Sequence, residues 1–537
     1  MAIISIPKKE IEKFTKINDE LIEKINLFGT PVEEIKEDII EIEVLPNRPD
    51  MFSIQGFLRS FKSYLGIEKG LKKYNIEKPK ENYKVIIDSS LKDIRPYTAC
   101  AIVKNLRFND EIIKQIIDLQ EKLHSTLGRN RKKMAIGIYP LEKINLPIKF
   151  EARKPENINF IPLEENKIMN GLEILQKNHT GREYAHLLSN LEKFPVFVDS
   201  SNKILSMPPI INSNETGRVT QETKEVFIEC SGFDFNLLKK TLNIITTTLA
   251  DLGGKIYGIE LDYGKKEITP NLDPQELYVN FNNVNKLIGL NLKDNEIIEL
   301  MSRMGYSYDG KKVFAPAWRT DILHEVDVIE DIAIAYGYDK LDPEIPKVAT
   351  IGEESEYGKF KSKITEILIG LGLIEILTYH LVKENEKEEN AIEVENSRTE
   401  YKFLRQNLII PSLRILSENK HNEYPQKMFE IGTIFNKVEN EIIEKEELVI
   451  LSSHSNANFT EAKQILEVIL DNLGLRYEIT ENTNNYFIEG RNGKILINDK
   501  IIALIGELHP RIITKFSLEK PVSLLQIDMD KLYSILK

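Results

Sequence analysis

Residues 316–341, PAWRTDILHEVDVIEDIAIAYGYDKL, carry the strongest physical signal in the chain and fix one helix of its fold. A helix that begins near Glu325 places Asp327, Glu330 and Asp331 at positions i, i+3 and i+4, so three carboxylates share one face. The apolar positions fall on the other face, toward a core: Val328, Ile329, Ile332 and Tyr336. The stretch therefore predicts an amphipathic helix with an acidic face.

Two interpretations of this acidic face remain open. Like charges at helical spacing repel, and a hard divalent cation such as Mg²⁺, which prefers oxygen ligands, relieves the repulsion. Asp321 lies just ahead of the helix, close enough to fold back and join such a site. Alternatively, the acids complement the positive end of the helix dipole and face water. In either case we expect His324 and Glu325 to pack and to cap the helix rather than to bind a metal.

The length, cysteine count and charge of the chain exclude several classes of protein. The chain has 537 residues, and because hydrophobic cores stop growing near about 250–300 residues we expect roughly three to five domains. Its two cysteines are too few for a disulfide scaffold or a thiolate zinc site. Neither a signal-peptide pattern nor an apolar run of about 18 residues is found, so we expect a cytoplasmic protein without a membrane span. The net charge of -12 argues against a non-specific nucleic-acid binder.

One basic segment is a candidate for a local RNA contact. Residues 128–133 read GRNRKK and contain Arg129, Arg131, Lys132 and Lys133. The same composition fits a solvated turn between a helix and a strand, and from the sequence alone this second interpretation is favoured.

The apolar pattern divides the chain into four regions of multi-domain α+β character. Residues 1–70 form an N-terminal α/β region, residues 84–264 a mixed α+β region, and residues 270–345 a small, winged-helix-like region that contains the acidic helix. Residues 355–537 are rich in strands with few crossover helices, which indicates an antiparallel sheet.

Two local patterns inside these regions predict element boundaries. A strand over residues 39–45 must end at the doubled proline of PNRPD, because proline lacks the amide that a sheet needs. A helix from Asp110 to about Leu127 is predicted by isoleucines and leucines at helical spacing.

Five stretches of the sequence together carry a resemblance to a known family. They are PNRPDMFSIQGFLRSF (46–61), KLHSTLGRNRKKMAIGIYPLE (122–142), MPPIINSNET (207–216), the acidic stretch 316–341, and IGELHPRIITKFSLEKPVSLLQIDMD (505–530). In this order they resemble the beta subunit of phenylalanine–tRNA ligase of the archaeal and eukaryotic type. One departure is visible: after the strand 134–138 the family usually continues with His and Asp, where this chain has Tyr139 and Pro140.

The resemblance implies a role inside a larger assembly. It implies an α2β2 tetramer that charges tRNA(Phe), in which the alpha subunit holds the site that uses ATP and phenylalanine. It also implies a magnesium ion, shared with the alpha subunit, at Asp321, Asp327, Glu330 and Asp331. That ion would tie the acidic face to the partner.

The last region resembles a class II synthetase core whose nucleotide site has been lost. Arg405 and residues 429–432, Phe-Glu-Ile-Gly, echo the second class II motif, in which an arginine grips phosphate bidentately. No glycine-rich strand and helix with an arginine supplies the third motif, and residues 506–510 stand in its place. We therefore expect an inactive core kept for subunit packing, and for Arg405 the favoured interpretation is a surface or interface arginine.

The resemblance also implies a proofreading site in residues 84–264. An apolar pocket rejects an isostere with an added hydroxyl by only about a hundredfold, so separating phenylalanine from tyrosine needs a second sieve. The family hydrolyses tyrosyl-tRNA, and the matching positions are Ser213, Glu229 and Ser231. Glu229 would accept the tyrosine hydroxyl and the serines would hold the ester end or a water, although relatives would be expected to carry Asp and Thr at 229 and 231.

Considered by themselves, these three residues fit a plainer interpretation. Isolated serines and a glutamate at a strand end are usually turn and cap residues, and no Ser-His-Asp pattern supports a protein nucleophile. A positioned water and a hydroxyl of the tRNA are the expected agents of hydrolysis. Two rival functions also remain: a nucleic-acid-binding protein built on residues 274–345, and a stand-alone hydrolase that edits tRNA without a synthetase partner.

Overall fold

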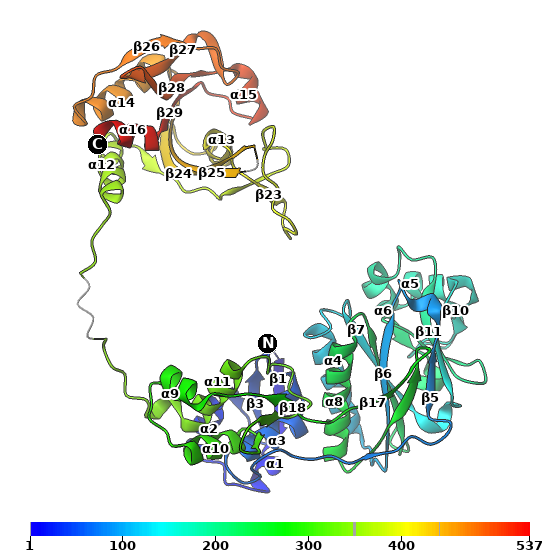
Figure 1. Cartoon of the computed structure of the whole chain (residues 1–537). Helices are drawn as coiled ribbons and strands as arrows, with labels where there is room; N and C mark the ends of the chain where they lie inside the picture. Colours follow the sequence, from blue (N-terminus) through cyan, green and yellow to red (C-terminus); the bar gives the residue numbers. More distant parts are fainter. Residues whose placement is uncertain (1, 347–350, 440) are drawn as a thin grey trace. The chain divides into compact units, whose positions relative to one another are not determined.

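The computed structural model describes residues 2–346, 351–439 and 441–537, and the chain forms two compact units (Figure 1). The first unit is Met1–Ile345 and the second is Pro346–Lys537. Each unit has its own hydrophobic core.

The first unit begins with a small antiparallel sheet of order β1-β3-β2. Its strands are β1 (Ala2–Pro7), β2 (Val32–Ile35) and β3 (Ile39–Val44), covered by α2 (Asp19–Leu27) and α3 (Ile54–Tyr64). The predicted stop at PNRPD is confirmed, since β3 ends at Val44. The rings of Phe57 and Phe61, which belong to α3, pack against the ring of Phe28.

The middle of the first unit consists of two packed sheets with helices on both outer faces (Figure 1). The first sheet has the order β4-β15-β6-β14-β7, with strands β4 (Ile76–Glu77), β15 (Lys255–Tyr257), β6 (Tyr97–Lys104), β14 (Val226–Gly232) and β7 (Met134–Pro140). The second has the order β13-β12-β11-β8-β5-β16-β17, with strands β13 (Ile211–Asn212), β12 (Ile204–Met207), β11 (Phe194–Val198), β8 (Ile148–Arg153), β5 (Lys84–Ile87), β16 (Ile259–Asp262) and β17 (Lys266–Thr269). The strand β7 is therefore an edge of the first sheet.

The side chains of the first sheet alternate between two cores. Cys100, Tyr139 and Phe227 face the second sheet, where they pack in one cluster with Phe150 and Phe197. The opposite face packs against α4 (Asp110–Ser125) and α8 (Phe235–Asp251). The predicted start of the helix at Asp110 is confirmed; the helix ends two residues before Leu127. This alternation places Glu229 of β14 on the face between the two sheets, because it pairs with Cys100 of β6.

The end of the first unit is a three-stranded antiparallel sheet with three helices. The strands are β18 (Gln275–Leu277), β20 (Val313–Ala315) and β19 (Ser307–Tyr308), and the helices are α9 (Phe281–Ile288), α10 (Asp294–Arg303) and α11 (Glu325–Tyr336). The helix predicted to begin near Glu325 is confirmed by α11.

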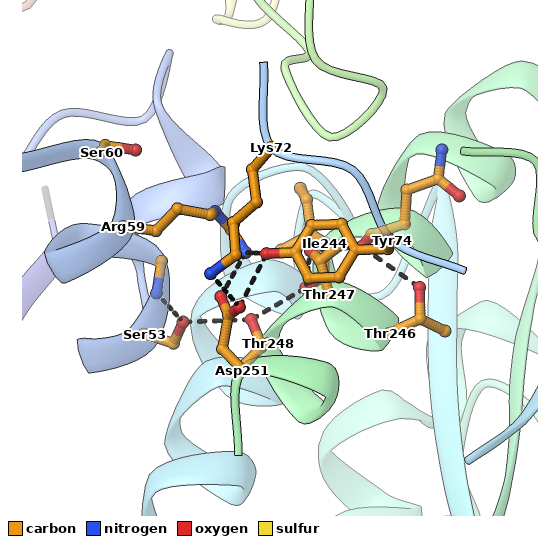
Figure 2. Close-up of polar contacts among 12 residues, drawn as sticks. Ser53, Arg59, Ser60, Lys72, Tyr74, Ile244, Thr246, Thr247, Thr248 and Asp251 are labelled. Atoms are coloured by element: carbon orange, nitrogen blue, oxygen red, sulfur yellow. Dashed lines mark hydrogen bonds and ion pairs between the residues drawn. The ribbon is translucent and has the colours of Figure 1, made fainter. Parts of the chain in front are cut away.

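A buried ion pair ties the parts of the first unit together (Figure 2). Nη1 of Arg59, on α3, lies 2.7 Å from Oδ2 of Asp251, at the end of α8. The hydroxyl of Tyr74 accepts from Arg59 at 2.9 Å and donates to Oδ1 of Asp251 at 2.7 Å. Lys72 also reaches Oδ1, at 2.9 Å, and the guanidinium of Arg59 stacks 4.5 Å from the ring centroid of Trp318. The network therefore joins α3, the segment after it, α8 and the last part of the unit.

The second unit is built on one seven-stranded sheet of order β21-β24-β25-β29-β28-β27-β26. The strands are β21 (Ile374–Glu375), β24 (Gln426–Val438), β25 (Glu441–Ser453), β29 (Val522–Asp528), β28 (Lys500–Leu508), β27 (Phe487–Ile497) and β26 (Glu478–Glu481). All neighbours are antiparallel except β21 with β24, which confirms the predicted antiparallel character. In the parts of both units that the structure describes, no helix is long and apolar enough to span a membrane.

Two sets of helices cover the two faces of this sheet. On one face lie α12 (Glu356–Gly370), α14 (Phe459–Asn472) and α16 (Met529–Leu536), and on the other α13 (Ile409–Glu418) and α15 (Pro510–Lys515). The second unit is thus a three-layer arrangement with an apolar core on each side of the sheet.

We expect the substitution Asp251→Asn to destabilise the first unit strongly. The change leaves the guanidinium of Arg59 buried without a countercharge, and breaking a buried pair in this way costs about 3–5 kcal/mol. The exposed pair Lys69–Glu299 is the matched control, and Glu299→Gln should change stability by less than about 1 kcal/mol. Urea unfolding, followed for both variants, measures the difference. Equal midpoints for Asp251→Asn and the unsubstituted chain would show that the network is not needed for stability.

Candidate functional site

A cavity of about 640 Å³ lies in the middle of the first unit, beside the edge strand β7. Its walls come from α4, from β7 and from residues 206–219, and they include His124, Ile136, Asn212, Gly217 and Glu229. Most of the lining is apolar, so a polar group on the wall decides which ligand fits.

Glu229 is a buried carboxylate on this wall, only 2% exposed. Strand pairing places it directly opposite Gly137 of β7. A Cβ atom at Gly137 would lie 2.7 Å from Oε1 of Glu229, closer than such contacts occur. The missing side chain of Gly137 therefore makes the room that the carboxylate occupies.

The two oxygens of Glu229 are in different situations. Oε1 lies 3.2 Å from the hydroxyl of Tyr139, which donates to it. Oε2 is buried and has no hydrogen-bond partner among the described residues. Burial raises the pKa of Glu229 to about 7, while the charge of Arg95 and the hydroxyls of Tyr139 and Ser231 act in the opposite direction. An acceptor of this kind leaves a hydrogen bond open for a ligand.

The two serines predicted for the same site are buried and do not line the cavity. Ser231 is fully buried, and its hydroxyl accepts from Nε of Arg95 at 3.0 Å. Ser213 is buried at the start of α7 (Asn214–Gly217), where its amide donates to the carbonyl of Leu205 at 2.8 Å. Neither serine is among the residues that line the cavity. Of the three predicted positions, Glu229 alone is on its wall.

Two further residues of the wall were not predicted as site residues. The amide of Ile136 donates to Nε2 of His124 at 2.9 Å, and Nδ1 of His124 lies 3.2 Å from Glu121. Because Nε2 accepts from this amide, the ring carries its proton on Nδ1. Burial lowers the pKa of His124 in the same direction. No periodicity in the sequence singles out this histidine, because its partner is the free amide of an edge strand distant along the chain.

Arg131 is the second of these residues, and it comes from the basic segment 128–133. The turn between α4 and β7 is confirmed, with Arg129 exposed. Arg131 instead donates to the carbonyl of Ile210 at 2.9 Å and to Glu121 at 2.8 Å. It therefore braces the 206–219 segment from the cavity side, which the interpretation as a wholly solvated turn had missed.

The acidic residues of 316–341 are not gathered as the spacing predicts. Arg319, 3% exposed, donates through Nε and Nη2 to both oxygens of Asp321, at 2.8 and 2.6 Å. Its Nη1 lies 2.9 Å from Asp331, which also accepts from Tyr306 at 2.6 Å. Asp331 is only 4% exposed, so the interpretation in which these acids face water is wrong for Asp331, because the buried guanidinium needs countercharges and holds it in the core.

The remaining two acids are also placed individually. Oδ2 of Asp327 accepts from the amides of Leu323 and His324, both at 2.7 Å, and so closes the start of α11. His324 caps the same helix, as predicted, by accepting from Val326 at 3.3 Å. Glu330 is exposed, and no described residue pairs with it.

A magnesium ion does not fit these four carboxylates as they stand. Among residues 2–346, 351–439 and 441–537, no group of three or more acidic, histidine or cysteine side chains is arranged to hold a metal. Arg319 pairs with both Asp321 and Asp331, and two backbone amides donate to Asp327. The chain by itself therefore pairs Asp321, Asp327 and Asp331 without a metal, and Glu330 stays exposed to solvent.

In the second unit, Arg405 is buried rather than on the surface, which corrects the favoured interpretation. Its Nη1 lies 2.6 Å from Oε1 of Glu430 and 2.7 Å from the hydroxyl of Thr378, and its Nε donates to the carbonyl of Thr433 at 2.8 Å. The hollow beside it has a volume of only about 10 Å³. A nucleotide does not fit into a space of that size.

Three family models match this chain, and together they span most of it. The B3/4 domain matches residues 92–248, the tRNA synthetase B5 domain matches residues 277–338, and the phenylalanyl tRNA synthetase beta chain CLM domain matches residues 341–529. The cavity and Glu229 lie within the first match, and the acidic residues lie within the second.

Whole-chain comparisons agree with these matches. The phenylalanine–tRNA ligase beta subunit of Thermococcus onnurineus is 40% identical over 91% of this chain and 90% of its own length. That of Archaeoglobus fulgidus is 36% identical over 99% of both chains. The solved N-terminal fragment of the Pyrococcus horikoshii phenylalanyl-tRNA synthetase beta subunit is 39% identical, with a TM-score of 0.60, and covers 63% of this chain and 100% of the fragment. The chain therefore belongs to the family of phenylalanine–tRNA ligase beta subunits, and it is a subunit of an aminoacyl-tRNA synthetase.

Proposed function

We propose that this chain proofreads for its synthetase by hydrolysing tyrosyl-tRNA(Phe), while a partner alpha subunit activates phenylalanine with ATP. The observation that supports the proposal most directly is Oε2 of Glu229, a buried acceptor without a partner among the described residues, on the wall of a cavity of about 640 Å³.

The open acceptor explains a preference for tyrosine. A tyrosine side chain in the cavity would donate its hydroxyl to Glu229, whereas phenylalanine would leave the carboxylate oxygen unpaired. An unpaired buried acceptor costs about 1–3 kcal/mol. A site that hydrogen-bonds a substrate hydroxyl rejects the analogue without it by as much as about 10⁴-fold.

The proposed reaction is the hydrolysis of an ester. The oxygen of a water attacks the ester carbonyl carbon, and the bond from that carbon to the terminal ribose oxygen breaks. The ribose oxygen takes a proton from the water, which gives tyrosine and uncharged tRNA. We assign no protein nucleophile, because Ser213 and Ser231 are off the cavity wall and Nε2 of His124 is already used by Ile136.

An exposed apolar surface on the second unit supports docking of the partner. Ile374 of the edge strand β21 is 69% exposed, and Leu377 and Tyr379, which follow it, are 83% and 73% exposed. Ile369 at the end of α12 is 55% exposed. Apolar side chains grouped in this way mark a protein interface, and we propose that the alpha subunit covers them in an α2β2 tetramer.

The division of labour within the chain is part of the same proposal. Residues 1–70, 84–264, 270–345 and 355–537 would act as N-terminal, editing, acidic and inactive class II-like domains. A shared magnesium ion at Asp321, Asp327, Glu330 and Asp331 would require the assembled enzyme, because Arg319 satisfies two of these acids in this chain.

The substitution Glu229→Leu should leave phenylalanylation by the assembled enzyme intact and lower tyrosyl-tRNA hydrolysis about tenfold or more, the factor that loss of one hydrogen bond implies. The matched control is Glu222→Leu, because Glu222 is an exposed acid that lies shortly before β14, the strand that carries Glu229. Deacylation of pre-charged tyrosyl-tRNA(Phe) measures both variants. Equal rates for Glu229→Leu and the unsubstituted enzyme would remove Glu229 from the site.

The chain purified without its partner should not catalyse ATP–pyrophosphate exchange with phenylalanine. The hollow beside Arg405 is too small for a nucleotide, and Glu430 already pairs with the guanidinium that would bind phosphate. Adding the alpha subunit should restore exchange. Exchange by the chain alone, at a rate above that of a mock preparation, would contradict an inactive class II-like core.

The substitution Glu330→Gln should raise the magnesium concentration needed for assembly with the alpha subunit, if the ion is shared there. Glu330 is the appropriate position because substituting Asp321 or Asp331 also breaks the ion pairs of Arg319. The exposed acid Glu344, changed to Gln, serves as the control. Sedimentation of the complex across a magnesium titration gives the readout, and superimposable titrations for the two variants would exclude a metal at this face.

A further inference from the structure

Tyr139 is buried between the two sheets of the first unit, at the point where they meet the cavity wall. It lies in β7, the edge strand beside α4 (Figure 1), and not in the loop after that strand. Its hydroxyl lies 2.8 Å from Oγ of Ser206, 3.3 Å from Oδ1 of Asn212 and 3.2 Å from Oε1 of Glu229. One phenol thus connects the carboxylate to the 206–219 segment that forms the opposite wall.

We propose that Tyr139 is a positioning residue that fixes the specificity of this site: its phenol holds one oxygen of Glu229 and leaves the other for the hydroxyl of a tyrosyl group. This inference rests on the proposed proofreading function and adds to it the residue that sets the selectivity.

The first support for the proposal is the difference between the two oxygens. The hydroxyl of Tyr139 donates to Oε1, and Oε2 has no partner in the described part of the chain. A carboxylate with both oxygens satisfied would gain nothing from a ligand hydroxyl, and one with both open would be free to rotate. With one oxygen held, the open oxygen has a fixed direction.

Gly137 is the second support, because it makes the contact between Tyr139 and Glu229 sterically possible. A Cβ atom there would lie 2.2 Å from the hydroxyl of Tyr139 and 2.7 Å from Oε1 of Glu229. Gly137 has no positive φ, so the need for glycine arises from space and not from backbone conformation. Gly137 and Tyr139 are two residues apart on one face of β7. Gly137 leaves space for the carboxylate of Glu229, and Tyr139 donates a hydrogen bond to it.

The third support is that the nearest cation does not take over the role of Tyr139. Arg95 is buried, but its Nε donates to Ser231 and it makes no ion pair with a described carboxylate. The other titratable group that faces Glu229 from the neighbouring strand is Cys100 on β6, which is buried and has a raised pKa. Tyr139 is therefore the described residue whose hydrogen bond, at 3.2 Å, holds the carboxylate.

The test is the substitution Tyr139→Phe in the enzyme assembled with its alpha subunit. We expect kcat/KM for deacylation of tyrosyl-tRNA(Phe) to fall about tenfold, with the slow deacylation of phenylalanyl-tRNA(Phe) unchanged. Because the phenol lowers the pKa of Glu229, the rate loss on acidification, which begins near neutral pH as the acceptor is protonated, should also move to higher pH. A residue that merely supported the fold would not move that midpoint.

Tyr257→Phe is the matched control, since Tyr257 is half-buried in the same unit and its hydroxyl makes no hydrogen bond to a described residue. Gly137→Ala is the second variant: it keeps both polar groups but displaces them, and it should lower selectivity in the same direction. If Tyr139→Phe instead raised the preference for tyrosyl-tRNA, the phenol would be a competitor for Glu229, which would overturn the inference. Unchanged selectivity and pH midpoint would overturn it as well.

These outcomes are separable from a failure of the proposed function. An unsubstituted enzyme that does not hydrolyse tyrosyl-tRNA(Phe) overturns the proofreading proposal and the inference together. An enzyme that hydrolyses it, loses this activity in Glu229→Leu and keeps it in Tyr139→Phe overturns the role of Tyr139 alone.

Discussion

The structure depends on the requirement that a buried guanidinium be given a partner. Desolvation of a charge costs several kcal/mol unless hydrogen bonds and a countercharge compensate for it. Arg59 meets the requirement through Asp251, Arg319 through Asp321 and Asp331, and Arg405 through Glu430. In the first unit the pair Arg59–Asp251 joins segments that are 192 residues apart along the chain, whereas Arg319 and its two partners fix the conformation of one local stretch, residues 319–331.

The proposed site stands out because this pairing is left incomplete there. Arg95 and Glu229 are both buried, yet Arg95 donates to Ser231, and one oxygen of Glu229 has no partner among the described residues. Burial raises the pKa of Glu229 to about 7 and lowers that of Arg95 to about 10. Both directions reflect a cost of desolvation that the fold does not remove. Such a cost is tolerated where a ligand supplies the missing contact, and perturbed groups of this kind gather at functional sites.

In the second unit, by contrast, the buried arginine Arg405 has a charged partner, Glu430. Arg405, which the sequence pattern aligns with a phosphate-binding arginine, donates through Nε and Nη1 to Thr433, Thr378 and Glu430. What remains open in this unit is apolar surface near β21 and the end of α12. A closed polar interior with an exposed apolar surface is suited to binding another subunit, and it is consistent with synthesis being carried out by the partner.

The sequence by itself determined several elements and the family, and it singled out Glu229 as a candidate site residue. Periodicity located α4 and α11, the prolines of PNRPD ended β3, and Glu229 was recognisable as the acid on an apolar strand. These features are local, because the spacing of apolar residues and the missing amide of proline act within a few residues.

Only the tertiary structure decided which charges and hydroxyls meet. Asp331 turned inward because Arg319 is buried beside it, and Tyr139 reached Glu229 from 90 residues away. A one-dimensional pattern specifies which face a side chain occupies; its partner is set by how distant strands and helices pack against that face.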